Sequence, residues 1–286
     1  LHLHTTASDG MLVPKALVER AKQARLHAIC ITDHDTVAGF PEAWHAGQAL
    51  GIEVLPGCEI SCDHDGKEIH VLGLLVDAND AFFADRLSTF RQERKAHLPR
   101  ILERLAELGV PVTEAEVRKY ATDEFVGRPH IARAMMARRY VNHLDEAFNR
   151  FLGTEAPAYV PRKRITSAEA IALIHRAGGV SVIAHPGVYH YADAHIASLA
   201  EVGLDGVEVM HPDHDEGLRT RYAEIARRRN LLMTGGSDFH GAERWKSRVQ
   251  PGSMSVPDTF LDQVRARSRH PKGIVPAAPA PATALS

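Results

Sequence analysis

The sequence predicts an α/β barrel with a helical insertion, on three observations. Short apolar runs alternate with helical patterns in residues 1–80 and again in residues 165–270. The middle of the chain shows helical patterns alone. Histidines and carboxylates follow several of the apolar runs, as in His2-Leu3-His4, Asp33-His34-Asp35 and Ser237-Asp238-Phe239-His240. A parallel barrel gathers its strand ends at one rim, so these residues would meet there.

The first 80 residues carry strand and helix patterns in turn. Leu17, Ala21 and Ala24 fall on one helix face, and Gly51 marks the end of a second helix. Runs of about four to eight apolar residues predict strands, and Asp63–Gly66 has the composition of a hairpin turn. The expected elements are a strand end at Leu1–His4, a helix at Val13–Arg25, a strand at Ala28–Thr32, a helix at Pro41–Leu50, and strands at Ile52–Leu55, Glu59–Cys62 and Ile69–Leu75.

Residues 81–164 are expected to form a helical insertion, because no comparable strand pattern interrupts them. Leu98, Ile101 and Leu105 form an apolar stripe that ends before Gly109. Shorter helices are expected at Glu114–Tyr120, Pro129–Arg139 and Leu144–Leu152.

The alternation of strands and helices resumes after Thr166. Ser167 is expected to cap a helix at Ala168–Ala177, with Glu169 as a favourable negative charge in its first turn. The tail at 271–286 is rich in Pro and Ala and is expected to be disordered. The remaining elements are strands at Val180–Ala184, Gly206–Met210 and Leu231–Thr234, and a helix at Glu216–Arg229.

The charge distribution along the chain is uneven, although the net charge is only −2. Of the 34 Lys and Arg and the 36 Asp and Glu residues, 16 and 10 lie between Arg86 and Arg164. The insertion is therefore basic and the remainder acidic. A basic segment beside an acidic, histidine-bearing one favours a phosphate-bearing substrate bound over metal ions.

The three cysteines, Cys30, Cys58 and Cys62, form no C-x-x-C pair. Their odd number and spacing argue against a disulfide framework or a structural zinc site. No apolar stretch is long enough to cross a bilayer, and no signal-peptide pattern is present. We therefore expect a cytoplasmic protein without a membrane partner and without sequence-specific DNA binding.

Histidines and carboxylates at the expected strand ends predict a metal site. His2 and His4 are two residues apart, which places both side chains on one face of a strand. Histidine and carboxylate ligands together suit Zn²⁺, Mn²⁺ or Fe and not a thiolate site. The other candidates lie in or just beyond strands, or in the following loop; they are Asp9, His34, Glu59, His70, His185, Asp238 and His240.

Six motifs in order resemble those of the PHP-domain phosphoesterases, which are relatives of the amidohydrolase superfamily. They span the whole expected barrel. The resemblance implies a distorted (β/α)₇ PHP barrel with a site for three metal ions. The motifs are His2-Leu3-His4-Thr5, Ala7-Ser8-Asp9-Gly10, Thr32-Asp33-His34-Asp35, Gly57-Cys58-Glu59, Ala184-His185-Pro186 and Gly236-Ser237-Asp238-Phe239-His240.

The resemblance also implies a ligand set for each cation. His2, His4, Glu59 and Asp238 would hold the first. Glu59 would bridge to a second, completed by His70 and His185, and Asp9, His34 and His240 would hold the third. Mn²⁺ is the expected metal, with Zn²⁺, Fe²⁺ and Mg²⁺ as alternatives.

Such a metal cluster suits phosphate ester hydrolysis. The cations would neutralise the phosphoryl oxygens and generate a bridging hydroxide that attacks phosphorus, with Glu59 at the catalytic centre. The leaving oxygen still needs a proton, for which Asp33, Asp35 and His211 are candidates. Orientation of His34 or of another ligand is the role that suits Asp33 and Asp35 better.

The insertion offers candidate contacts for substrate phosphate. Arg128 and His130 stand in Gly127-Arg128-Pro129-His130, which opens an expected helix, and a helix N-terminus with an arginine favours phosphate. The run resembles the Arg-Pro-His element that one PHP branch uses on substrate phosphate. Lys163 and Arg164, in the basic triplet that begins at Arg162, are further candidates for a second, non-reacting phosphate.

The motifs and the basic insertion most resemble those of the PHP branch that releases the 3′-phosphate from nucleoside 3′,5′-bisphosphates, so the resemblance implies that activity. A 5′-3′ exoribonuclease acting on short RNA ends is the nearest alternative, since it shares the same PHP branch. Histidinol-phosphate phosphatase fits the insertion less well. An amidohydrolase would be expected to carry a lysine at a strand end, and the non-enzymatic alternative is a degenerate PHP module that serves folding or binding.

Overall fold

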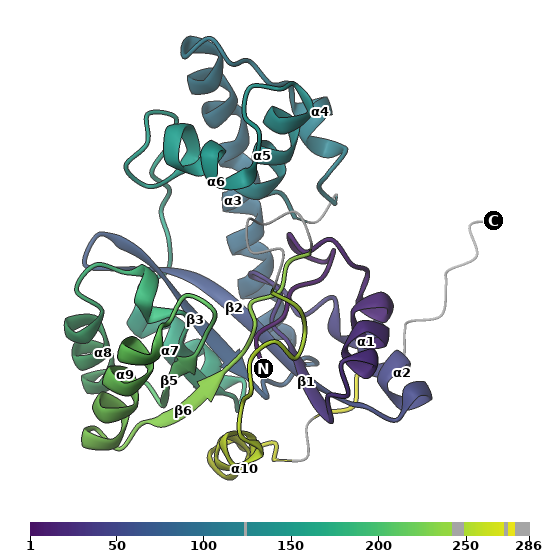
Figure 1. Cartoon of the computed structure of the whole chain (residues 1–286), viewed down its shortest axis with the longest axis vertical. Helices are drawn as coiled ribbons and strands as arrows, with labels where there is room; N and C mark the ends of the chain where they lie inside the picture. The colour runs from purple at the N-terminus through teal and green to yellow at the C-terminus, as the bar shows by residue number, and fades with distance from the viewer. Residues whose placement is uncertain (123–124, 242–248, 272–273, 278–286) are drawn as a thin grey trace.

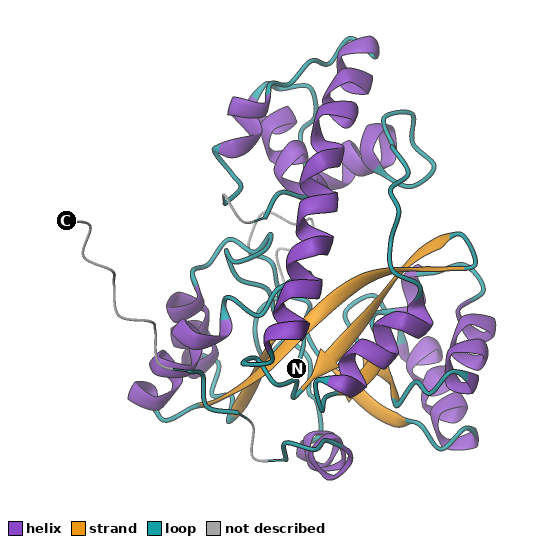
Figure 2. Ribbon diagram, turned by 180° about the vertical axis from the view of Figure 1, so that it is seen from behind, coloured by secondary structure: helices purple, strands orange, loops and turns teal. Residues whose placement is uncertain are grey.

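The computed structural model describes residues 1–122, 125–241, 249–271 and 274–277. Figure 1 shows a lower body built on a β-sheet with helices around it, and an upper body made only of helices. From behind, one long helix runs from the lower body into the upper one (Figure 2). The chain returns to the lower body through residues 153–166.

The sheet has six strands that are hydrogen-bonded in chain order, β1 to β6. The outer pairs are parallel, whereas β3 runs antiparallel to both of its neighbours. The hairpin between β2 and β3 turns through Asp65 and Gly66, whose φ values of 53° and 78° fit a type I′ turn. The strands are β1 (Ala28–Ile31), β2 (Glu53–His64), β3 (Lys67–Leu74), β4 (Val180–Ile183), β5 (Gly206–Met210) and β6 (Leu232–Gly235).

Residues 1–4 lie between the two edge strands and close the sheet into a barrel. The amino group of Leu1 donates to the carbonyl of Gly235 at 2.9 Å, on the β6 side. On the β1 side, the amide of Thr32 donates to the carbonyl of Leu3 at 2.9 Å. The predicted distorted α/β barrel is therefore confirmed, and its N-terminal segment supplies the seventh strand position.

In the part of the chain that the structure describes, six helices cover the barrel. Each buries an apolar face against the strands, as α1 does with Leu17, Val18 and Ala21. Two of them, α8 and α10, are absent from the sequence prediction. The helices are α1 (Pro14–Gln23), α2 (Phe40–Leu50), α7 (Ser167–Arg176), α8 (Ala192–Glu201), α9 (Glu216–Arg228) and α10 (Asp258–Arg267).

The upper body has an apolar core of its own. Leu105, Val117, Ile131 and Phe151 belong to this core, which is separate from the clusters of the barrel. The long α3 contains Pro99 and carries the polar residues that later meet the barrel. The helices are α3 (Ala81–Glu107), α4 (Glu114–Arg118), α5 (Arg128–Ala137), α6 (Leu144–Ala147) and the π-helical η1 (Phe148–Leu152).

Two local predictions were wrong. The expected strands at Ile52–Leu55 and Glu59–Cys62 are one strand, β2. It continues through Gly57, where a Cβ would stand 2.6 Å from Cys30 Sγ, so the glycine lets the two strands approach. The helix predicted to follow Ser167 is capped by Thr166, whose hydroxyl accepts the amide of Glu169 in a capping box.

Most of the tail expected to be disordered lies outside the described residues. Within its described part, Val275 and Ala277 hydrogen-bond to the side chain of Asn79. Among the described residues, no helix combines the length and apolar composition that crossing a bilayer requires.

Candidate metal centre

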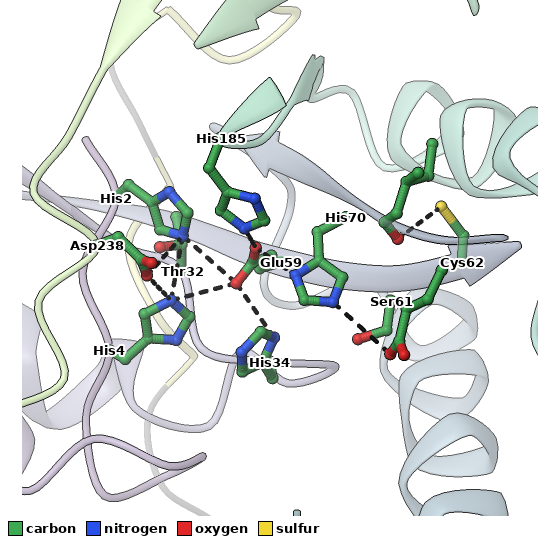
Figure 3. Close-up of polar contacts among 12 residues, drawn as sticks. His2, His4, Thr32, His34, Glu59, Ser61, Cys62, His70, His185 and Asp238 are labelled. Atoms are coloured by element: carbon green, nitrogen blue, oxygen red, sulfur yellow. Dashed lines mark hydrogen bonds and ion pairs between the residues drawn. The ribbon is translucent and has the colours of Figure 1, made fainter. Parts of the chain in front are cut away.

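Four side chains predicted to share a cation meet in the barrel (Figure 3). The Nε2 atoms of His2 and His4 lie 3.1 Å apart. Glu59 Oε2 lies 3.4 and 3.2 Å from them, and Asp238 Oδ1 lies 3.3 and 3.2 Å from them. Distances of this size are those expected between neighbouring ligand atoms that each lie about 2.0 Å from one cation. The four atoms therefore form a candidate set of ligands for one cation.

Glu59 stands at the middle of the cluster, and Figure 3 shows histidines around both of its carboxylate oxygens. Oε1 lies 2.9 Å from His70 Nδ1 and 2.9 Å from His185 Nε2. Oε2 lies 3.1 Å from His34 Nδ1. The structure thus brings together the residues predicted for the second cation, with Glu59 in the position of a bridging ligand.

The third predicted set is also assembled, but it is looser. Asp9, His34 and His240 gather with His4, which also faces the first position. Asp9 Oδ1 lies 3.2 Å from His240 Nε2 and 3.9 Å from His4 Nδ1. Asp9 Oδ2 lies 3.9 Å from His34 Nε2. The two distances of 3.9 Å are longer than any of those given for the first set, so small movements of the loops would change how these ligand atoms converge.

Glu208, which the sequence reasoning missed, orients two of the ligands. Its carboxylate oxygens lie 3.1 and 3.2 Å from His2 Nδ1, and one accepts the backbone amide of His185 at 2.8 Å. A carboxylate on one ring nitrogen fixes the other nitrogen toward the metal position. The signal was present as a lone Glu in the apolar run Gly206–Met210, because a buried carboxylate needs partners.

Asp33 supports the site from outside it. Its carboxylate accepts hydrogen bonds from the amide and hydroxyl of Thr5 and from the hydroxyl of Ser8, each at 2.7 Å. Burial raises the pKa of Asp33. Asp33 is absent from the lining of the metal cavity. Its position fits the orientation of the loop that carries Asp9, and does not fit the predicted role as proton donor.

The backbone at two ligands adopts unusual conformations. His185 and Asp238 have φ values of 32° and 49°, in the left-handed region that residues with a Cβ seldom occupy. Gly236, two residues before Asp238, lets the chain pass close to His2, since a Cβ there would stand 2.3 Å from the Cβ of His2. Both residues follow strands, so the unusual turns direct their side chains back into the barrel mouth.

Side chains of the cluster have pKa values far from their usual ones, because buried histidines and carboxylates lie close together there. Although burial opposes charge on His4, the neighbouring carboxylates of Asp238 and Glu59 raise its pKa to about 9. Burial opposes charge on Glu59 too, yet the neighbouring histidines hold its pKa well below the usual range. Among the described residues, His4 Nδ1, His34 Nδ1 and Glu59 Oε2 are buried without a hydrogen bond. A divalent cation would satisfy these donors, so the residues fit a metal site.

The cluster opens into a cavity of about 250 Å³ between the barrel and the insertion. Pro129, Leu144 and Phe148 of the insertion line it opposite the metal ligands. His211 also lines it. The amide of Asp213 donates to His211 Nδ1 at 3.1 Å, so the neutral ring carries its hydrogen on Nε2.

The predicted phosphate contacts fall into two groups. Arg128 and Arg164 both bind Glu68 Oε2, at 2.9 and 2.7 Å, and line a second cavity. His130 is buried, and its Nδ1 accepts the amide of Gly127 at 3.0 Å. Lys163 is exposed and lines neither cavity. His130 thus caps its helix, and Lys163 projects elsewhere, so the structure brings only the two arginines together.

Comparison with known proteins agrees with this geometry. The model of the PHP domain family matches residues 1–148. The chain is 34% identical to the 5′-3′ exoribonuclease Rnm of Escherichia coli K12, covering 86% of each protein. It is 31% identical to the 3′,5′-nucleoside bisphosphate phosphatase of Chromobacterium violaceum, covering 84% of this chain and 86% of that one.

A solved structure has the same fold. It is the putative metal-dependent phosphoesterase of Bifidobacterium adolescentis, 32% identical, with a TM-score of 0.86 over 93% of this chain and 95% of that one. The cluster at the strand ends is therefore a candidate site for a divalent metal, and the enzyme is a metal-dependent phosphoesterase. The chain belongs to the PHP family of metal-dependent phosphoesterases.

Proposed function

We propose that the enzyme releases the 3′-phosphate from nucleoside 3′,5′-bisphosphates with three Mn²⁺ ions at the barrel mouth. The observation that carries this proposal is a pair of neighbouring cavities. One contains the metal ligands, and the other is lined by arginines. Glu68 stands between them, since Oε1 lies 3.8 Å from His70 Nε2 while Oε2 binds Arg128 and Arg164.

The arginine cavity has the charge and size for a phosphoryl group. Four guanidinium groups line it, and their described carboxylate partners are Glu68 and Asp35. The excess of positive charge matches a phosphate monoester dianion. The cavity measures about 40 Å³, room for roughly three water molecules or for the oxygens of one phosphate. The arginines are Arg94, Arg128, Arg162 and Arg164.

Arg162 gives the strongest support for an anion in this cavity. Its Nη2 is buried without a hydrogen-bond partner among the described residues. Burial, reinforced by the charge of Arg94, lowers the pKa of Arg162 to about 10. A buried, unsatisfied donor in a positive field is stabilised by an incoming anion. In our proposal the 5′-phosphate binds here while the 3′-phosphate reaches the metal centre.

The reacting phosphate would meet side chains that suit its chemistry. The cations held there would neutralise phosphoryl oxygens and lower the pKa of a bound water. Glu59 would hold the cations at fixed separation, because its two oxygens face different histidines. His211 would donate a hydrogen bond from Nε2 to the leaving 3′-oxygen, since its Nδ1 already accepts a backbone amide, and the leaving oxygen would take its proton from water.

The alternative function, a 5′-3′ exoribonuclease, is supported by the name of the E. coli relative. It would use the same two cavities, because a 5′-phosphorylated RNA end also presents a terminal phosphate to the arginines. The difference lies in the bond that reaches the metal centre, a 3′-phosphomonoester in one case and a phosphodiester in the other.

Phosphate or nucleotide release by the Mn²⁺-loaded enzyme would test the proposal. The panel contains adenosine 3′,5′-bisphosphate, adenosine 3′-monophosphate, a short 5′-phosphorylated RNA and histidinol phosphate. We expect the highest kcat/KM on the bisphosphate. A higher value on the RNA would favour the exoribonuclease, and one on histidinol phosphate would reject both nucleotide substrates.

A further inference from the structure

Arginines of the helical insertion hold barrel segments that carry ligands of the third cation position. The first is Arg133 on α5, whose Nη2 donates to the backbone carbonyl of Asp9 at 3.0 Å. Arg133 is only 8% exposed, so this bond lies inside the joint between the two bodies. The carbonyl belongs to the residue whose carboxylate faces His240 and His34.

The second is Arg94 on α3, which holds the segment next to His34. Its Nη2 lies 2.5 Å from Asp35 Oδ2 and 2.9 Å from Ser61 Oγ. Arg91, one turn earlier, donates to the carbonyl of Asp35 at 2.8 Å. Asp35 has a φ of 52°, a conformation that needs such support. The turn that follows His34 is thereby fixed from the insertion.

Phe125 extends this contact to the ligand ring itself. Its ring lies nearly parallel to that of His34, with centroids 6.3 Å apart and an interplanar angle of 9°. The guanidinium carbon of Arg94 lies 4.9 Å from the centroid of Phe125. A cation over an aromatic face is attractive, so Arg94, Phe125 and His34 are aligned as a stack.

At the first cation position, a residue of the barrel, and not one of the insertion, orients a ligand. Its ligand His2 is oriented by Glu208, a residue of the barrel strand β5. Its donor atoms are already 3.1 to 3.4 Å apart. At the third position, Asp9 still lies 3.9 Å from both His4 Nδ1 and His34 Nε2. The geometry of the third position therefore depends on two loops, and each is bonded to the insertion.

We propose that Arg133 and Arg94 are positioning residues through which the insertion sets the metal affinity of the third cation position. This inference rests on the proposed three-cation centre and goes beyond it, because it assigns the insertion a role in assembling the site. Residues that orient ligands from outside typically change metal affinity by about 10- to 100-fold. We expect that range at the third position alone.

Arg133→Gln is the decisive variant, because it removes the guanidinium that donates to the backbone carbonyl of Asp9 and leaves the carboxylate of Asp9 in place. Arg138→Gln is the matched control. Arg138 lies at the end of the same helix and pairs with Glu116 inside the insertion. Arg133→Lys and Arg94→Lys keep the charge and serve if the glutamine variant folds poorly. Thermal unfolding in chelator identifies a folding defect.

The readout is calorimetric titration of each metal-free protein with Mn²⁺, together with the metal content after dialysis. We expect the third equivalent to bind about 10- to 100-fold more weakly in Arg133→Gln, with the first two unchanged. Arg138→Gln should match the wild type, and Arg133→Lys should recover part of the loss.

Two results would overturn the inference, and they are distinguishable. If the wild type takes up fewer than three equivalents, the three-cation centre itself is wrong. If the wild type takes up three and Arg133→Gln does so with the same affinities, or all three weaken alike, the insertion does not set the third position.

Discussion

The carboxylate of Glu208 lies 3.1 Å from His2 Nδ1 and directs the opposite nitrogen of that ring at His4, Glu59 and Asp238. The same carboxylate accepts the amide of His185, which stands in a left-handed conformation. One buried residue therefore fixes ligands at two cation positions.

Glu208→Ala should weaken binding of the first two cations by about 10- to 100-fold, because the rings of His2 and His185 lose their orientation. Calorimetric titration with Mn²⁺ would measure this loss. Glu224→Ala, an exposed glutamate on α9, is the control and should bind as the wild type does. Equal affinities for Glu208→Ala and the wild type would refute the orienting role.

Glu59→Gln should lower kcat/KM by at least about 100-fold, since a neutral amide cannot offset the positive charge of two cations as a bridging carboxylate does. In chelator, the free energy of unfolding should change far less than activity does. Phosphate release and denaturant unfolding give the two quantities, and exposed Glu107→Gln is the control. Near-normal turnover would remove Glu59 from the bridging position.

Arg128→Ala should reduce kcat/KM for adenosine 3′,5′-bisphosphate by about 10- to 100-fold, the loss expected for one charge-assisted hydrogen bond. The value for adenosine 3′-monophosphate should stay near that of the wild type, because that substrate has no 5′-phosphate. Initial rates on both substrates, with exposed Arg138→Ala as control, would show the difference. A parallel loss on both substrates would contradict a 5′-phosphate contact.

Metal binding should release protons at neutral pH. Although burial opposes charge on His4 and His70, the neighbouring carboxylates raise the pKa of each to about 9 in the metal-free protein. Both rings are then protonated at pH 7 and must lose a proton to bind a cation. Affinity should therefore rise with pH up to about 9. Calorimetry in buffers of different ionisation enthalpy measures the release, and binding without it would contradict these shifts.

Stability should fall as pH drops from about 6.5 to about 4, partly through His214. Burial lowers the pKa of His214 from 6.5 to about 4. The ring donates from Nδ1 to the carbonyl of Val209 and accepts the amide of Gly187 at Nε2, so protonation costs the second bond. Between these pH values only the unfolded chain binds the proton, a contribution of about 2–3 kcal/mol.

Urea unfolding of metal-free protein at pH 7 and pH 4.5 would measure that contribution. His214→Gln should show a smaller loss of stability between the two pH values than the wild type. His45→Gln, at an exposed position on α2, should behave as the wild type. If the stability of His214→Gln depends on pH as that of the wild type does, His214 does not cause the loss of stability at low pH.

Local patterns were sufficient for much of the fold. The strand Gly206–Met210 was predicted with the bounds that the structure has. The failures occurred where distant contacts override local signals. Pro56-Gly57 reads as a break, yet β2 continues through it because Gly57 lies against Cys30 of β1. Thr166 and Ser167 are both good caps, and only the fold of the chain selects the first.

The candidate site also has features that the sequence predicts and features that it does not. Residue type and spacing sufficed to select the nine candidate metal ligands, which the structure brings close together, because the strand ends of a barrel converge whatever the side chains around them. The residues that contact the candidate ligands and the candidate phosphate-binding arginines could not be predicted from the sequence. Glu208 and Glu68 are single glutamates in strands, and their roles appear only when His2 and Arg128 are found beside them.

The sequence by itself determined the family pattern, the barrel and the residue types of a metal centre, because these depend on periodicity and on motifs a few residues long. The tertiary structure alone decided that Asp33 supports a loop and that arginines of the insertion hold Asp9 and Asp35. Those roles depend on which groups more than twenty residues apart share one buried space, and burial makes each polar group dependent on the partner it finds there.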